Sequence, residues 1–235
     1  MIAYEKLPLD NEVKAALEGL EIEYVFQPPI FYKDCVRIYA YEALMRPKKM
    51  TVGQLIDEFA RDEKLHILEV ATFFGATQAY IERGYQEYLC INSFPSESFT
   101  ENEAEAFDTY FGNQKGKRII EILEYPKVSL REWVRKSEMV QNKHWKVSLD
   151  DFGMGENNMN AVYLYTPDIV KLDRSLICGI DNDARKQENV RTYLESFHER
   201  GMQVLAEGVE TREECDFLRS LGVDLFQGYY LAMPA

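Results

Sequence analysis

The chain has 235 residues and a formal net charge of −13, with 46% hydrophobic and 29% charged side chains, a composition typical of a globular domain. The excess of acidic residues argues against binding to polymeric nucleic acid or to an anionic membrane surface, because both favour basic patches. The sequence has no apolar run of membrane-spanning length, no signal-peptide pattern and no CxxC pair among its four cysteines, so we expect a cytoplasmic protein with reduced thiols.

Two segments rich in β-branched and aromatic residues, 22–33 and 36–47, open the chain, and the Lys33-Asp34 turn between them predicts a β-hairpin. Helical periodicity follows over 51–84, and strands then alternate with helices. Thr211 and Glu214 predict a capping box at the start of the last helix. The later predicted strands are 88–92, 118–124, 145–151, 169–173, 203–207 and 225–231. The helices between them are one ending at 112 and those at 129–140, 157–164, 184–199 and 211–221.

Alternating strands and helices are typical of parallel βα units, and about eight strands in a chain of this length favour a TIM-type (β/α)8 barrel. The opening hairpin makes one strand near the N-terminus antiparallel to the others, so we expect a modified α/β barrel. An open, doubly wound sheet is the alternative, although the sequence has neither common kind of glycine-rich phosphate loop. We expect a single domain over 1–235, in which 1–21 is a lead-in segment.

Charged and amide side chains stand at or near the C-terminal ends of the predicted strands. The clearest case is Asp150-Asp151, which closes an apolar run just before the turn at Gly153. Because the C-terminal ends of barrel strands meet on one face, we expect these residues to become neighbours. Their oxygens suit hard divalent cations, and a carboxylate shared by two cations is the usual core of a hydrolytic phosphodiester site. The set comprises Glu42, Asn92, Glu121, Asp150, Asp151, Lys171, Glu207, Glu210 and Gln227.

Each of these residues also has a structural explanation when it is taken alone. Glu42 could cap a helix or form an ion pair, Asp150-Asp151 could simply begin a turn, and Lys171 could be an ordinary lysine at a strand end. Glu207 and Glu210 flank a turn into a helix, where acids favour the N-terminal dipole. Their occurrence together at successive strand ends favours a functional site.

In these residues the chain resembles the EAL-domain family of cyclic di-GMP phosphodiesterases. The motif that gives the family its name is Glu42-Ala43-Leu44, followed here by Met45-Arg46. The resemblance covers about 22–234, with the segments in the family's order. The other matching segments are Gln27-Pro28, Ile91-Asn92, Glu121 to Glu124, Asp150 to Gly153, Lys171 to Asp173, Ala206 to Glu210 and Gln227 to Tyr230.

The resemblance implies a site with two divalent cations, Mg²⁺ or Mn²⁺, at which Ca²⁺ would inhibit. One cation would be held by Glu42, Asn92, Glu121 and Asp150. Asp150 would bridge to the second, which Asp151 and Glu207 would complete. Lys171 would position the attacking water, and Glu207 is equally a candidate general base.

The resemblance also implies that cyclic di-GMP is hydrolysed to linear pGpG in bacterial second-messenger signalling, by a protein that forms a homodimer. The residues implied to contact substrate are Gln27, Leu44, Arg46 and Gln227. Glu124 would anchor the loop after the paired aspartates, and Glu210 would orient neighbouring groups.

Two departures from the family pattern leave the activity open. Leu123 stands where the family has a threonine, and the 153–160 loop lacks the family's tyrosine and serines. The alternative from another class is therefore a catalytically silent cyclic di-GMP receptor or protein-interaction module on the same fold. An unrelated Mg²⁺-dependent barrel enzyme such as a lyase is a third possibility.

Overall fold

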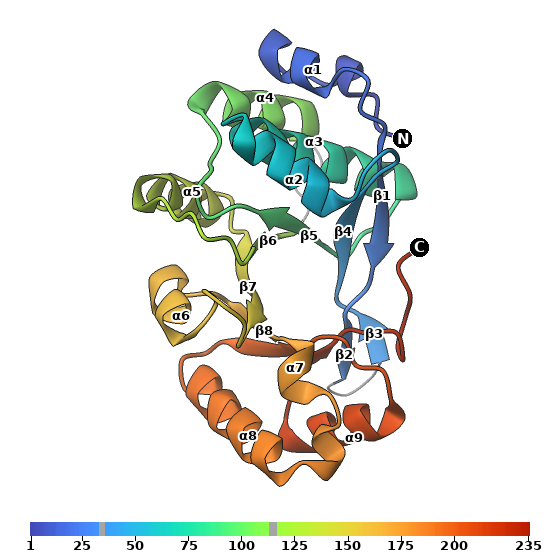
Figure 1. Ribbon diagram of the computed structural model, residues 1–235, viewed down its shortest axis with the longest axis vertical. Helices are drawn as coiled ribbons and strands as arrows, with labels where there is room; N and C mark the ends of the chain where they lie inside the picture. The colour runs from blue at the N-terminus through green and yellow to red at the C-terminus, as the bar shows by residue number, and fades with distance from the viewer. Residues whose placement is uncertain (33–35, 113–116) are drawn as a thin grey trace.

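The computed structural model describes residues 1–32, 36–112 and 117–235. Within these residues it is an α/β fold with one curled sheet, whose outer face is covered by helices (Figure 1). The strands are β1 (Ile22–Gln27), β2 (Ile30–Tyr32), β3 (Val36–Ile38), β4 (Ala40–Pro47), β5 (Tyr88–Ser93), β6 (Arg118–Ile122), β7 (Lys146–Phe152), β8 (Ile169–Leu172), β9 (Gln203–Ala206) and β10 (Leu225–Phe226). Their order across the sheet is β1-β4-β5-β6-β7-β8-β9-β10-β2-β3.

The strands from β4 to β10 pair in parallel and in chain order, as the alternating pattern predicts. The two short 3-10 helices of the described chain span Tyr4–Lys6 and Ile180–Asn182. The α-helices are α1 (Asn11–Leu17), α2 (Val52–Arg61), α3 (Leu65–Arg83), α4 (Glu101–Phe111), α5 (Leu130–Asn142), α6 (Met159–Tyr165), α7 (Arg174–Ile177), α8 (Ala184–His198) and α9 (Arg212–Leu221). Helices α7 to α9 lie at one end of the view in Figure 1 and α1 to α4 at the other.

The N-terminal hairpin supplies the predicted antiparallel part of the barrel. β1 pairs with β4, whereas β2 lies between β3 and β10, all in antiparallel fashion. Pro28 and Pro29 separate β1 from β2, because proline has no backbone N–H for the ladder. The register shifts by one residue at this point, so residues 28–29 face 39–41. The predicted turn at Lys33-Asp34 lies outside the described residues.

Two predicted elements differ from the structure. The stretch 51–84 forms two helices, α2 and α3, because the backbone of Glu63 takes a left-handed conformation (φ 57°) that no helix continues through. The last strand ends at Phe226 instead of 231, because the chain turns back after Gly228, whose carbonyl oxygen accepts from the amide of Leu231. The capping box of Thr211 and Glu214 at the start of α9 is confirmed.

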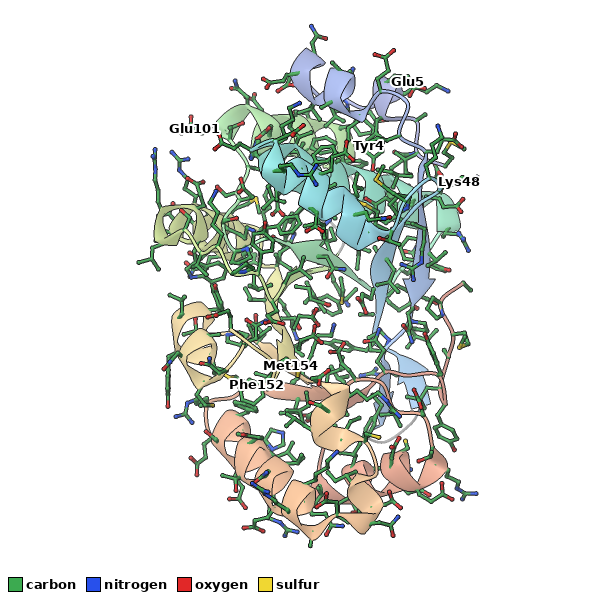
Figure 2. All side chains as sticks on the ribbon, viewed as in Figure 1. Tyr4, Glu5, Lys48, Glu101, Phe152 and Met154 are labelled. Atoms are coloured by element: carbon green, nitrogen blue, oxygen red, sulfur yellow. The ribbon has the colours of Figure 1, made fainter. Side chains whose placement is uncertain are left out.

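Side chains fill the space between the sheet and its helices (Figure 2). The larger apolar cluster joins the outer face of the sheet to the helices, and α3 contributes many of its buried residues. A smaller cluster fills the inside of the curled sheet, and its buried members are Ala40, Cys90, Ile119, Ile169, Leu205 and Leu225. Among the described helices, none combines the length and the apolar character needed to cross a lipid bilayer.

Candidate active site

The candidate site forms the layer directly above the smaller apolar cluster. Six of its polar residues, on the strands or just past their C-terminal ends, each follow a cluster residue by two positions, and side chains two apart on a strand face the same side of a sheet. The inside of the barrel therefore changes from apolar to polar at the C-terminal ends of the strands. The pairs are Ala40 and Glu42, Cys90 and Asn92, Ile119 and Glu121, Ile169 and Lys171, Leu205 and Glu207, and Leu225 and Gln227.

The ammonium group of Lys171 lies at the centre of this layer, and its side chain is only 3% exposed. Its Nζ lies 2.7 Å from Asp150 Oδ1 and 2.6 Å from Glu207 Oε1. It also contacts Glu121 Oε1, and Glu42 Oε2 lies 4.0 Å away. The ammonium group of Lys171 is therefore surrounded by acids from four other strands or strand ends. These acids are far apart in the sequence but lie around the same point in the structure.

Two amide side chains complete the layer. Gln227 Nε2 donates to Glu42 Oε2 at 2.5 Å, so β10 and β4 are joined above the apolar cluster. Asn92 lies opposite Glu121 in the parallel register of β5 and β6.

Burial and charge move the pKa values of these groups in a consistent pattern. Burial lowers the pKa of Lys171, but the surrounding acids, led by Asp150, outweigh it and hold that pKa well above its usual value. Burial raises the pKa of Glu121 and of Glu207 well above the usual range, although Lys171 opposes this. Burial and then the charge of Asp150 raise the pKa of Asp151 to about 6. The acids outnumber the lysine among them, and a divalent cation would relieve the excess negative charge.

The residues present fit such a cation, because single carboxylate oxygens of Asp150, Asp151 and Glu207 lie within 4.8 Å of one another. Strict alternation would turn consecutive aspartates to opposite faces of the sheet. The β7 strand avoids this with a register shift between Leu149 and Phe152, where Asp151 takes a left-handed backbone conformation (φ 46°). The irregularity brings both carboxylates to the same site.

The loop after the paired aspartates is tied to the strand next to it. Glu124 Oε1 accepts from the backbone amide of Glu156 at 3.2 Å. A Cβ atom on Gly155 would lie 1.7 Å from the same oxygen, so the Glu124 contact requires glycine there. Asn157 Nδ2 donates to the Asp150 carbonyl oxygen at 2.7 Å, which links the loop to the acid cluster. Asn157 could not be predicted as part of the site, because a polar residue in a loop carries no distinctive sequence pattern.

Of the residues expected to contact a substrate, Gln227 lies within the polar layer, whereas Gln27, Leu44 and Arg46 lie around it. Gln27 is buried, and its Nε2 donates to the Ala232 carbonyl oxygen at 3.2 Å. Leu44 and Arg46 lie beyond Glu42 on β4, where Leu44 is half-buried and Arg46 is exposed. Glu210 is paired with Arg174, whose Nη2 lies 2.7 Å from Glu210 Oε2.

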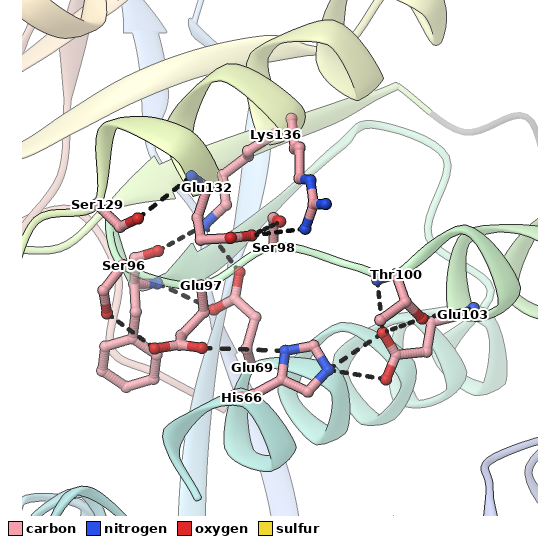
Figure 3. A network of polar contacts seen from close by, with 12 residues as sticks. His66, Glu69, Ser96, Glu97, Ser98, Thr100, Glu103, Ser129, Glu132 and Lys136 are labelled. Atoms are coloured by element: carbon pink, nitrogen blue, oxygen red, sulfur yellow. Dashed lines mark hydrogen bonds and ion pairs between the residues drawn. The ribbon is translucent and has the colours of Figure 1, made fainter. Parts of the chain in front are cut away.

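A second polar network, which the sequence analysis missed, lies behind β5 (Figure 3). Lys136 on α5 and Glu69 on α3 form a fully buried ion pair, with Nζ and Oε1 2.9 Å apart. Ser93 donates to Glu69 at 2.6 Å and accepts from Lys136, while the Phe94 amide donates to Glu69 at 2.9 Å. Ser93 follows Asn92 and faces the other side of β5, so the network holds that strand end from outside the barrel.

Comparison with known proteins matches nearly the whole chain to one family. The EAL domain family matches residues 10–234. The chain is 36% identical over 85 residues, 36% of this chain and 15% of the relative, to cyclic di-GMP phosphodiesterase TpdA of Vibrio parahaemolyticus. It is 25% identical over 245 residues, 95% of this chain and 45% of the relative, to probable cyclic di-GMP phosphodiesterase PdeN of Escherichia coli K12.

Among solved structures, a standalone versatile EAL protein from Vibrio cholerae O395 in its c-di-GMP-bound form gives a TM-score of 0.79. The two chains are 26% identical, and the match covers 92% of this chain and 93% of that one. By contrast, this chain spans less than half the length of the first curated relatives that it matches.

Proposed function

Because the chain belongs to the EAL domain family, we propose that it is a metal-dependent phosphodiesterase that hydrolyses cyclic di-GMP to linear pGpG. The observation that carries the proposal is the acid cluster around Lys171, in which Glu42, Glu121, Asp150 and Glu207, all expected to hold a cation, converge on one point. The phosphodiesterase names of the relatives TpdA and PdeN support the same substrate.

Two divalent cations, Mg²⁺ or Mn²⁺, would occupy the polar layer. Glu42, Asn92, Glu121 and Asp150 would hold the first, and Asp150, Asp151 and Glu207 the second, in line with the oxygens that converge there. When bound, the cations would supply the positive charge that polarises a phosphodiester and lowers the pKa of water.

The chain's own groups would bind, orient and move protons. The Lys171 ammonium is held at the centre of the site, where it would orient the nucleophile and offset the negative charge that develops on the phosphoryl oxygens. Burial raises the pKa of Glu207, which suits either a general base or a ligand. Gln227 fixes one Glu42 oxygen by its hydrogen bond. Arg46, Leu44 and Gln27 would contact the phosphate and base of the dinucleotide at the rim.

We propose in addition that the chain forms a homodimer through α5, α6 and the loop between β7 and α6. Both helices pack against β7 and lie next to each other in Figure 1. This surface carries large apolar side chains in contact with solvent, and such patches mark protein interfaces. Its exposed members are Leu130, Val134, Met154, Tyr163 and Leu164. Light scattering tests the proposed dimer by comparing the molar mass of wild type with that of Tyr163→Glu. Wild type is expected to be a dimer and Tyr163→Glu a monomer, because the new charge would be buried in the interface.

The second candidate is a cyclic di-GMP receptor without turnover. Leu123 favours it, because an apolar side chain there removes a hydroxyl next to Glu121 and Glu124, and Leu123 packs on the core instead. A receptor would bind the nucleotide through the same rim and not release pGpG.

The test is hydrolysis of cyclic di-GMP by the purified chain with Mg²⁺ or Mn²⁺, followed as pGpG, beside Glu42→Gln and Asp150→Asn. Glu195→Gln, an exposed change on α8, is the matched control. Cation-dependent product in wild type and control, lost in the two site variants, is the expected result. Nucleotide binding without product would favour the receptor. If the chain neither binds cyclic di-GMP nor releases pGpG, a role with this nucleotide is excluded.

A further inference from the structure

The Glu207 carboxylate is central to the site, yet it does not belong to a strand. β9 ends at Ala206, and residues 207–210 form a turn in which Gly208 has a left-handed backbone (φ 68°). On the strand side, the Glu207 amide donates to the Leu172 carbonyl oxygen at 3.1 Å. Lys171 contacts the Glu207 carboxylate directly, and the backbone position of Glu207 depends in addition on what holds the rest of the turn.

Arg174, the first residue of α7, covers this turn from outside the acid cluster. Its Nη1 donates to the Gly208 carbonyl oxygen, and its Nη2 lies 2.7 Å from Glu210 Oε2. Its aliphatic part lies flat on the glycine, since a Cβ atom there would come within 3.0 Å of Arg174 Cβ and Cδ. The guanidinium thus holds the residue directly after Glu207 by both its carbonyl and its open face.

A buried glutamate on α9 holds the C-terminal end of the same turn. Glu214, buried on α9, accepts from the amides of Glu210 at 3.0 Å and Thr211 at 3.2 Å. Its other oxygen accepts from the Gly179 amide at 2.9 Å, and Arg174 Nη1 lies 3.9 Å from Glu214 Oε2. The guanidinium therefore faces a carbonyl and two carboxylates at once, which suits its planar fork and not the point charge of a lysine.

Arg174 is also linked to the two other parts of the site. It lies three residues after Lys171 on the same segment. The intervening Asp173 donates its amide to the Phe152 carbonyl oxygen at 3.2 Å, directly after the paired aspartates. One short segment therefore connects the ends of β7, β8 and β9.

We propose that Arg174 is a positioning residue for Glu207, which it holds in place through the Gly208 carbonyl without touching substrate. The structural part of the proposal stands by itself, whereas its effect on cation binding and turnover rests on the proposed function. Groups that orient ligands from behind typically change metal affinity or activity by about 10–100-fold when they are removed.

The test compares Arg174→Met and Arg174→Lys with Arg212→Met. Arg212 is the matched control, because it is a 73% exposed arginine on α9 that pairs only with Asp216 at 3.3 Å among the described contacts. Amide hydrogen exchange over 206–210 tests the contact without cation or substrate. Faster exchange in Arg174→Met than in Arg212→Met is expected, and equal exchange would overturn the proposal whatever the activity.

Mn²⁺ binding to the purified chain, followed by electron paramagnetic resonance, and the kinetics of cyclic di-GMP hydrolysis test the consequence. Arg174→Met should bind Mn²⁺ about 10–100-fold more weakly and lose kcat more than it raises KM, with Arg174→Lys between it and wild type. Affinity and kcat equal to those of Arg212→Met would refute the role in positioning. If wild type does not hydrolyse cyclic di-GMP, the proposed function fails, but the exchange and Mn²⁺ comparisons still decide the role of Arg174.

Discussion

The buried pair of Lys136 and Glu69 gives the sharpest prediction for the stability of the fold. Both side chains are 1% exposed, and Lys136 Nζ also donates to the Phe94 carbonyl oxygen at 2.6 Å. Lys136→Met fills a similar volume but leaves the Glu69 carboxylate buried with, among the described residues, only Ser93 and the Phe94 amide as donors. Breaking a buried pair on one side costs about 3–5 kcal/mol. In a chain of this size that loss lowers Tm by roughly 6–20 °C.

Urea and thermal unfolding followed by circular dichroism measure the effect. Lys49→Met is the control, because Lys49 forms an exposed pair with Glu21 at 3.2 Å that contributes less than about 1 kcal/mol. The double variant Glu69→Gln/Lys136→Met removes both charges together, so it should recover much of the loss of Lys136→Met. Unfolding of Lys136→Met at the same urea concentration as Lys49→Met would refute the reasoning, and so would a double variant whose losses simply add.

Three further predictions concern the loop, the pH dependence and the central lysine. Gly155→Ala should free the β7–α6 loop from Glu124 and lower turnover. Gly53→Ala on α2, where an added Cβ atom would lie 4.0 Å from Thr51 Oγ1, should not, and steady-state kinetics compare the two variants. The hydrogen bond to Glu103 raises the pKa of His66 in the folded chain above the usual 6.5. The protonated His66 side chain therefore stabilises the fold fully below pH 6.5, and this stabilisation is lost as the pH rises through the folded-state pKa. The unfolding free energy of wild type should therefore exceed that of His66→Gln by more at about pH 5.5 than at about pH 8.5, as urea titrations at the two values would show. Lys171→Met should lower kcat by about 10²–10³-fold but bind Mn²⁺ more tightly, because the ammonium competes for Asp150 and Glu207; weaker binding in calorimetry would contradict this.

The sequence alone was sufficient for the parts of the site that follow from local periodicity. Glu42, Glu121, Lys171 and Glu207 each stand two residues after an apolar residue of a short strand, so their meeting inside a barrel follows from alternation. The capping box at Thr211 depends on neighbours three residues apart and was predicted for the same reason.

The features that the sequence could not show depend on contacts between distant segments or on single backbone conformations. Lys136 and Glu69 are 67 positions apart on two different helices, so no local pattern shows that they form a pair. The left-handed backbone of Asp151, which turns two consecutive acids to one side, does not follow from residue type, because most aspartates do not adopt it even though they do so more often than most other residues. The hydrogen bond from Arg174 to the Gly208 carbonyl oxygen likewise joins residues 34 positions apart.

These features together explain how the fold carries a cluster of acids that would destabilise most interiors. Burial raises the pKa values of Glu121 and Glu207, so without compensation the charged forms of these groups cost folding free energy. Lys171 offsets part of that cost in the chain alone, through its contacts with Glu121, Asp150 and Glu207. Contacts outside the cluster fix the backbone next to it, where Arg174 bonds to the turn after Glu207 and the Lys136 network bonds to the end of β5. A rigid surround is required because acids that could move apart would relieve their own repulsion and would no longer present a site for cations.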